Sequence, residues 1–427
     1  MKERATPSVP SVVEPSATLA ADERVRGKIA AGTSVVHLAF GEAGLPVLPG
    51  LGEVLGRAAR DNSYGSVAGS PAAREAAAGY FERRGLPTRP EQVVFAPGSK
   101  ALLFALLRLL PGDVILARPS WVSYAAQAAL VGKRVLQVPI GERGGVPDPA
   151  TLAESLAAAR DSGLRPGVLV VTTPDNPTGT IPSRERICEL ATIAGENDLL
   201  VISDEIYRDL AFGEVTSLAE LLPDRTFVTS GLSKSMALGG WRIGFARLPD
   251  SELGNEALHA LTGLASEVWS SLAAPMQRVA EYVLSEPEEV REHLRTSRLL
   301  HERTVTAAYE VLVAGGIDCR PPGGAFYLYP DFEPIRPQLS ALGVETADGL
   351  AELLLDRFAI AVLSGTAFGD DPSGLRFRMA TSLLYGRTDE ERWRALRSDD
   401  PAALPWIRAA LDSLAHALAT LSAGRSG

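Results

Sequence analysis

The feature that most constrains this 427-residue chain is an alternation of short apolar segments with helix-like segments between residues 92 and 246. Apolar runs of this length are typical of strands that are buried on both faces of a sheet. The strand-like segments are residues 92–96, 114–117, 135–140, 168–173, 199–203, 226–229 and 243–246. The helix-like segments are residues 99–110, 120–131, 149–160 and 183–197. The pattern predicts an α/β fold with a mostly parallel sheet covered by helices on both faces.

After about residue 250 the pattern changes to longer helices and scattered short strands, which predicts a second, α+β domain. Helical stretches are expected at 275–285 and 290–314, and strands at 325–328, 361–363 and 375–380. Residues 1–14 are polar and rich in Pro and Ser, so we expect a disordered leader there. Residues 386–404 are charged and contain Pro, which suggests an inserted loop or short helix.

Composition excludes several classes of function. The net charge is −10, and nucleic-acid binding needs a basic footprint that we do not find. No apolar run is long enough to span a bilayer, and no signal peptide is recognisable. The two cysteines, Cys188 and Cys319, lie in no metal-binding or disulfide pattern. We therefore expect a cytoplasmic protein that binds neither a metal ion, nor a membrane, nor nucleic acid.

Polar residues follow the ends of the predicted strands, which is where α/β sheets place their active sites. Gly98, Ser99 and Lys100 open a helix, whose free backbone N–H groups could bind a phosphate, although an ordinary helix start would look the same. Trp121 could stack on a flat ring or simply pack in the core. Asn176 lies between prolines in a segment that could be only a turn.

Three further residues follow later strands. Asp204 ends an apolar strand and would need a cation if buried, although a helix N-cap is the alternative. Lys234 could form a Schiff base and Arg242 could grip a phosphate, whereas most such cations are surface residues. Taken one by one these signals are weak, but in this order at successive strand ends they predict a pyridoxal-phosphate site.

The chain resembles the fold-type I pyridoxal-phosphate enzymes, specifically the class I/II aminotransferases, from residue 15 to about residue 382. The segments that carry the resemblance are Asn-Pro-Thr-Gly at 176–179, Ser-Asp-Glu-Ile-Tyr at 203–207, Ser-Lys at 233–234, Gly-Trp-Arg-Ile-Gly at 240–244, Gly-Gly-Ala-Phe-Tyr at 323–327 and Arg-Phe-Arg-Met-Ala-Thr-Ser at 376–382.

The resemblance implies a three-layer αβα large domain with a mostly parallel seven-stranded sheet, and a smaller α+β domain built from both chain ends. Residues 15–48 would pack on the small domain, 49–290 would form the large domain, and 291–427 would complete the small one. A homodimer with active sites at the interface is also implied.

Site roles follow from the same resemblance. Lys234 would be the Schiff-base lysine, Asp204 would pair with the pyridine nitrogen, and Asn176 and Tyr207 would bind the ring's phenolate oxygen. Trp121 would stack on the ring, while Gly98, Ser99, Lys100, Ser233, Arg242 and a Tyr64 contributed by the neighbouring subunit would hold the phosphate. The substrate would be bound by Arg376 at its α-carboxylate, by the backbone of Gly41 and by Asn176. Arg378, two residues further on, is expected to face the other side of its strand and is given no role.

Substrate preference is open at this point. The family's usual Gly-Glu-Pro-Asp-Phe is Gly-Glu-Ala-Gly-Leu at 41–45, and no second arginine is clearly placed for a distal carboxylate, which disfavours strict aspartate or glutamate specificity. Candidates near the substrate side chain are Leu45, Tyr124, Glu267 and Trp269. Elimination, cyclisation or oxidation on the same scaffold is the main rival to transamination, and a non-catalytic cofactor-binding sensor is a remote one.

Overall fold

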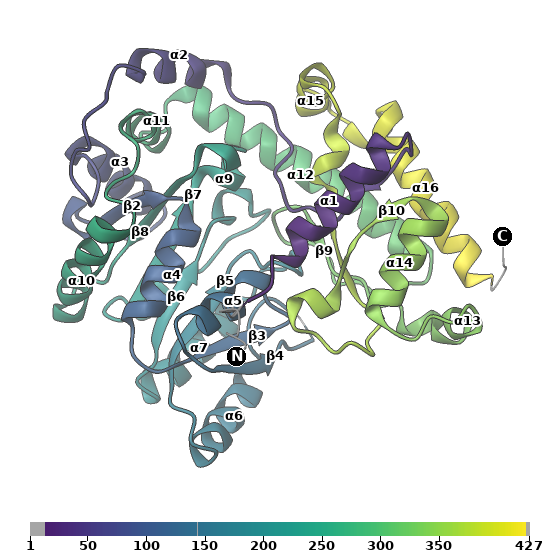
Figure 1. Cartoon of the computed structure of the whole chain (residues 1–427), viewed down its shortest axis with the longest axis horizontal. Coiled ribbons are helices and arrows are strands. Elements are labelled where there is room, and N and C mark those ends of the chain that lie inside the picture. The colour runs from purple at the N-terminus through teal and green to yellow at the C-terminus, as the bar shows by residue number, and fades with distance from the viewer. Residues whose placement is uncertain (1–12, 143, 424–427) are drawn as a thin grey trace, which may run out of the picture.

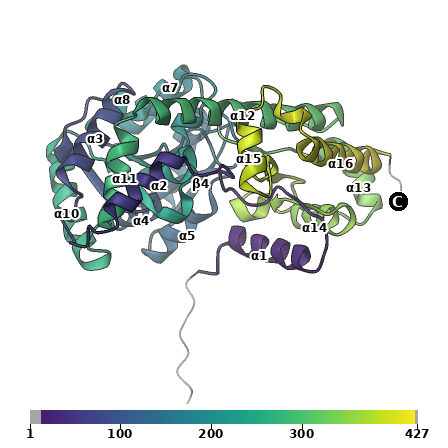
Figure 2. The ribbon, with the colours of Figure 1, turned by 90° about the horizontal axis from the view of Figure 1, so that it is seen from above.

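The computed structural model describes residues 13–142 and 144–423, so the predicted leader lies almost wholly outside the described residues. Two parts lie side by side, a larger one built on a wide sheet and a smaller one that contains the helices α1 and α16 (Figure 1). The 27-residue helix α12 (Glu288–Ala314) runs along both of them (Figure 2).

The larger part is built on the seven-stranded sheet that was expected. Its strand order is β2-β8-β7-β6-β5-β3-β4, and only β8 runs antiparallel to its neighbours. The strands are β2 (Val93–Pro97), β3 (Asp113–Arg118), β4 (Val135–Pro139), β5 (Pro166–Thr172), β6 (Leu200–Asp204), β7 (Thr226–Gly231) and β8 (Ile243–Arg247). The prediction of a mostly parallel sheet is therefore confirmed.

Helices cover both faces of this sheet because successive side chains of each strand point in opposite directions. In β2, Val94 packs in the cluster that contains α4, α5 and α10, whereas Phe95 packs on the opposite side with α3 and α11. The β3–β6 end of that second face is covered by α6 and α7. These helices are α3 (Pro71–Glu82), α4 (Ser99–Leu109), α5 (Val122–Leu130), α6 (Pro149–Asp161), α7 (Arg184–Glu196), α10 (Glu252–Val268) and α11 (Ala274–Leu284).

Among the described helices of ten or more residues, α10 and α2 (Pro49–Ala58) were not expected from the sequence. The second contains Gly50, Gly52 and Gly56, and each glycine in a helix costs about 1 kcal/mol relative to alanine. It forms because Leu51 and Val54 are buried in the cluster that also contains α11. Tertiary packing here overrides local propensity.

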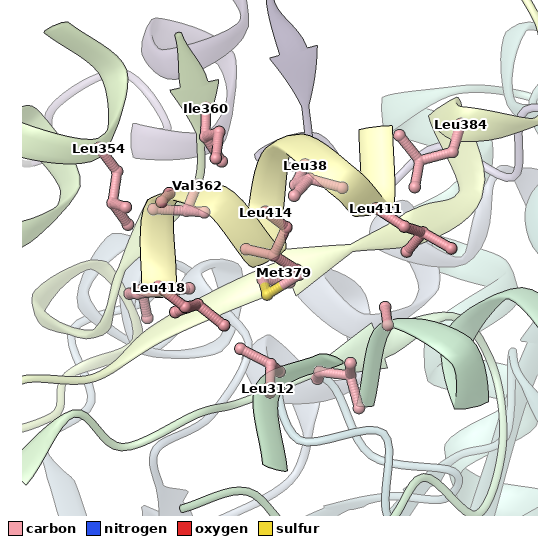
Figure 3. Close-up of a cluster of buried hydrophobic side chains, with 14 of the residues drawn as sticks. Leu38, Leu312, Leu354, Ile360, Val362, Met379, Leu384, Leu411, Leu414 and Leu418 are labelled. Carbon is pink, nitrogen blue, oxygen red and sulfur yellow. The ribbon is translucent and has the colours of Figure 1, made fainter. Parts of the chain in front are cut away.

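The small part combines both chain ends. β1 (Val36–His37) pairs in parallel with β10 (Ile360–Ala361), and a second sheet has the order β11-β12-β9 with antiparallel pairing. Figure 3 shows its core, in which Leu38 from the N-terminal segment lies among side chains from α12, β12 and the C-terminal helix. The remaining elements are α1 (Ala17–Ala30), β9 (Tyr327–Leu328), α13 (Arg336–Ala341), α14 (Ala347–Phe358), β11 (Leu363–Ser364), β12 (Phe377–Ala380), α15 (Asp389–Leu396) and α16 (Pro405–Ser422).

The segment 386–404 contains one short helix, α15, which begins with a capping box between Thr388 and Glu391. Its Trp393 ring lies 6.4 Å from that of His293 in α12. The segment is therefore packed on α12 and on the core of the small part. Within residues 13–142 and 144–423, no helix is both long enough and apolar enough to cross a membrane.

Candidate active site

The predicted site residues follow strands whose carboxyl ends lie along one edge of the sheet. Gly98 follows β2, Trp121 follows β3, Asn176 follows β5, and Asp204 ends β6. Lys234 lies in the short helix α9 (Leu232–Ser235), directly after β7. A parallel sheet thus gathers residues that are far apart in the sequence.

Asp204 is a buried carboxylate with only 3% of its surface exposed. It accepts hydrogen bonds from Tyr124 Oη at 2.7 Å and from Thr229 Oγ1 at 3.2 Å. Burial raises the pKa of Asp204 to about 6, although these hydrogen bonds partly oppose the rise. No ion pair to Asp204 is found among the described residues, so its ionised form still lacks a cation.

Lys234 is placed so that its ammonium is disfavoured. Burial lowers its pKa to about 8, and the positive charges of Arg378, Arg242 and Lys100 act in the same direction. Its Nζ donates a hydrogen bond to the backbone carbonyl of Gly41 at 2.5 Å. A lysine in this state is neutral more often near neutral pH than an ordinary lysine, and a nucleophilic or proton-transferring amine has to be neutral.

Asn176, Tyr207 and Arg378 form a buried hydrogen-bonded group. Arg378 donates from Nη1 to Asn176 Oδ1 at 3.1 Å and from Nη2 to the Ala39 carbonyl at 2.7 Å. The amide nitrogen of Asn176 lies 3.4 Å from Tyr207 Oη. Arg378 is 1% exposed, its Nε has no partner among the described residues, and no ion pair to it is found there. A buried guanidinium in this state is well suited to a carboxylate ligand.

Arg376, which was expected at the site in preference to Arg378, lies outside this group. Arg376 forms a bidentate ion pair with Asp370, at 2.7 and 3.0 Å, and a further one with Asp331 at 3.2 Å. Residues two apart share a face of a strand, so alternation does not separate the two arginines as was expected. The two arginines differ in their position relative to the strand. Arg376 precedes β12, whereas Arg378 lies within it.

An anion-binding arrangement lies at the start of α4. Gly98 has φ +92° and is the N-cap residue of α4. No side chain caps this end of the helix. A Cβ on Gly98 would lie 2.1 Å from Nη2 of Arg242, so the guanidinium lies directly against this backbone. Lys100 adds an ammonium 5.1 Å from the centre of the Trp121 ring, and burial lowers the pKa of Lys100. Backbone N–H groups and cations meet here as they do at phosphate sites. Ser233 precedes Lys234 in α9.

Other expected residues are placed as follows. Trp121 is half-buried, edge-on to the Tyr124 ring at 5.1 Å, and Tyr64 is 80% exposed. Among the candidates for the substrate side chain, Leu45 is in the small part's core, Tyr124 is bound to Asp204, and Glu267 is exposed and bonded to Ser266. Trp269 packs in the core cluster of α4 and α10. Among residues 13–142 and 144–423, no group of three His, Cys, Asp or Glu side chains could hold a metal ion.

Sequence reasoning gave no role to two members of the cluster, Arg378 and Tyr327, whose hydroxyl oxygen lies 2.8 Å from that of Tyr207. It named Tyr124 as a candidate near the substrate side chain, and the structure bonds Tyr124 to Asp204. Arg378 and Tyr327 both lie in motifs that the sequence analysis had noted. The sequence did not show in which direction their side chains point. Tyr124 lies one helical turn after Trp121, which places it close to the same strand ends.

Comparison with known proteins agrees with this arrangement. Residues 48–384 match the family model "Aminotransferase class I and II". The chain is 32% identical to the aspartate aminotransferase of Geobacillus stearothermophilus, over 88% of this chain and 95% of that protein. It is 33% identical to the aspartate/prephenate aminotransferase of Thermus thermophilus, over 83% of this chain and 89% of that protein.

The fold is also similar to solved structures. The aspartate aminotransferase from Thermus thermophilus with maleate superposes with a TM-score of 0.79 and 30% sequence identity, covering 92% of this chain and 98% of that one. The similarity therefore extends over both parts of the molecule.

Proposed function

Because the chain belongs to the class I and II aminotransferases, a pyridoxal-phosphate-dependent family, we propose that it moves an amino group from aspartate or a closely related dicarboxylic amino acid to a 2-oxo acid. That it is an aminotransferase follows from the family and its relatives. The observation that carries the proposed site is Lys234, a lysine with a lowered pKa that shares one sheet edge with Asp204, Asn176 and Tyr207.

The residues present fit pyridoxal 5′-phosphate. Asp204 is a buried carboxylate without a cation, which suits a protonated pyridine nitrogen. The close approach of Arg242 to Gly98 leaves no room for a side chain on that glycine, as expected for a backbone that receives a phosphate. Trp121 would face the ring, and Ser99, Ser233 and Arg242 would hold the phosphate.

When bound, the cofactor supplies an electron sink for negative charge that develops at the substrate Cα. Lys234 Nζ would take the proton from that carbon, because its lowered pKa leaves part of the amine neutral near pH 7. Asp204 would keep positive charge at the ring nitrogen, and Tyr124 and Thr229 would hold its carboxylate in place. Asn176 and Tyr207 would orient the ring through its phenolate oxygen.

Arg378, in place of Arg376, is proposed to bind the substrate α-carboxylate. Its hydrogen bonds to Asn176 and to the Ala39 carbonyl fix the guanidinium plane. Tyr327 and Phe368 lie on either side at 4.8 and 5.0 Å from its Cζ to their ring centres. Such a fixed fork favours a planar carboxylate. The backbone carbonyl of Gly41 accepts a hydrogen bond from Lys234 Nζ.

Lys100 is the proposed partner of a distal substrate carboxylate. No carboxylate bonds to its ammonium among the described residues, and it lies beside Trp121. The relatives named aspartate aminotransferase and the neighbour solved with maleate, a dicarboxylate, support an acidic substrate. This proposal revises the sequence-based leaning away from aspartate, which had considered only a second arginine.

We also propose a homodimer in which Tyr64 of each chain reaches the phosphate of the neighbouring site. The support is its exposure of 80%, unusual for a large aromatic residue, and the hydrogen bond that ties its carbonyl to Ser271. A cytoplasmic location is proposed as well, and the two free cysteines agree with it.

A spectroscopic experiment tests the proposed function. The purified protein, supplied with cofactor, should show a visible absorbance band that K234A loses. Adding L-aspartate without any oxo acid should convert this band to that of the pyridoxamine form, which absorbs at shorter wavelength. Release of ammonia or of an altered product with the original band restored would favour elimination, cyclisation or oxidation. A band that responds to no amino acid would favour a sensor.

A further inference from the structure

We propose that Tyr327 is a positioning residue that sets the hydrogen-bond donor strength of Tyr207 toward the bound cofactor. The inference rests on the proposed placement of Tyr207 at the phenolate oxygen of the cofactor. It is carried by a direct contact, since the two hydroxyl oxygens lie 2.8 Å apart and both side chains are buried.

Tyr327 is held where it is by contacts with several site residues. A Cβ on Gly41 would lie 2.5 Å from its hydroxyl oxygen, and a Cβ on Gly179 would lie 2.1 Å from its backbone carbonyl. Arg378 lies over its ring at 4.8 Å, and its ring meets that of Tyr207 nearly at a right angle, 81°, at 5.5 Å. These contacts fix the position of the ring and of its hydroxyl oxygen.

Either hydroxyl of the pair could be the donor, and the proposal assigns that role to Tyr327. The other acceptor near Tyr327 Oη, the Gly41 carbonyl, lies farther away, at 3.5 Å. Tyr207 is therefore the closer acceptor for the Tyr327 hydroxyl. Asn176 also offers an N–H to Tyr207 at 3.4 Å. With two donors directed at its oxygen, Tyr207 keeps its own hydrogen for a ligand.

Hydrogen bonds in such a chain polarise one another, so a donor at Tyr207 makes Tyr207 a better donor in turn. Tyr327 lies in β9 of the small part, whereas Tyr207 directly follows β6 of the large part. The bond therefore makes the donor strength of Tyr207 depend on how the two parts are placed. The charged groups that face this pair are Lys234, Arg378 and Asp204.

The pH dependence of the visible spectrum of the holoenzyme tests the inference. A donor at the phenolate oxygen stabilises the deprotonated chromophore, so losing it should raise the spectral pH midpoint. We expect Y207F to raise the midpoint clearly, and Y327F to raise it by a smaller amount, a few tenths of a pH unit. The double variant should match Y207F alone, because Tyr327 acts only through Tyr207.

Tyr329 provides a matched control, since it lies two residues further along and its hydroxyl bonds to Asp370 at 2.9 Å. Y329F removes an equally buried hydroxyl and should leave the midpoint unchanged. An unchanged midpoint in Y327F, or a double variant that shifts further than Y207F, would overturn the inference while the wild-type half-reaction with aspartate still stands. A wild-type protein with no visible band would overturn the proposed function and this inference with it.

Discussion

Arg378 and Asn176 are 202 residues apart in the sequence, yet Nη1 of the arginine donates to Oδ1 of the asparagine at 3.1 Å inside the protein. This bond joins β12 of the small part to the turn after β5 of the large part. It places the Arg378 guanidinium within reach of the cluster that contains Lys234. The positive charge of Arg378 helps to lower the pKa of Lys234.

The first prediction separates the two arginines of this segment. R378K should lower kcat/KM for the amino donor by about 10- to 100-fold, because the bidentate bond to a carboxylate is lost. R376K should change kcat/KM only slightly, because Arg376 bonds to Asp331 and Asp370. Steady-state kinetics of both variants with the same substrate pair is the measurement. A larger loss in R376K would return the carboxylate role to that residue.

The second prediction concerns Asp204, whose removal should harm activity but not folding. D204N should lower kcat by about 100-fold or more, since charge stabilisation at the ring is lost. The pKa of Asp204 is raised to about 6 in the folded protein, so the native state binds more protons than the unfolded state between about pH 4 and pH 6. The stability contribution of Asp204 therefore falls as pH rises through this window.

Apoprotein D204N should accordingly melt at or above the wild-type temperature at pH 8. This advantage should shrink toward pH 4, where the wild-type carboxyl is protonated. Thermal unfolding followed by circular dichroism at both pH values checks it. A variant that is less stable than wild type at pH 8 would mean that the ionised Asp204 stabilises the fold.

The third prediction compares two glycines that both have positive φ. Gly98 has φ +92° and Arg242 against it, whereas Gly132 has φ +74° and nothing within 4 Å of an added Cβ. Alanine strains the backbone at either position, because L residues rarely adopt positive φ. Only G98A should also displace Arg242 and weaken cofactor binding, measured by titrating apoprotein with pyridoxal 5′-phosphate. Equal affinities for G98A and G132A would contradict the proposal that Gly98 and Arg242 bind the phosphate.

The fourth prediction tests the proposed substrate class through Lys100. K100M should raise KM for aspartate by about 10-fold or more, since a charged hydrogen bond is lost. An amino acid with an uncharged side chain should show little change in KM. The affinity for the cofactor is measured alongside, because Lys100 also lies near the cradle. Equal losses for both donors would assign Lys100 to the phosphate instead.

The fifth prediction tests whether Tyr64 acts across a dimer interface. Y64A and K234A should each be nearly inactive. Mixing them under conditions that exchange subunits creates hybrids in which one of the two sites has both residues intact. Activity should then rise to about a quarter of the wild-type value if subunits mix at random. If mixing restores nothing, Tyr64 and Lys234 do not belong to sites shared between subunits.

The large-domain sheet was readable from the sequence because continuous apolar strands alternate with helices, and Asp204 and Lys234 became candidates because they follow such strands. The sequence could not decide between Arg376 and Arg378 for a geometric reason. Positions 376 and 378 lie on the same face of the strand, so periodicity could not choose between them. What decides is the register, in which Ala380 lies opposite Tyr327, and a register depends on contacts between distant segments. Helix α2 was not predicted because its three glycines have low helix propensity, although one face of the helix is buried.

The pairing of β1 with β10 has a consequence for how the chain is made. Residues 36–37 are synthesised more than 300 residues before their partners, residues 360–361. The sheet of the large part lies between them and is continuous in sequence, so it can fold first. Throughout that interval the edge of β1 and the apolar Leu38 have no native partner. A nascent chain of this protein therefore has to keep β1 from pairing wrongly until residues 360–361 have been synthesised.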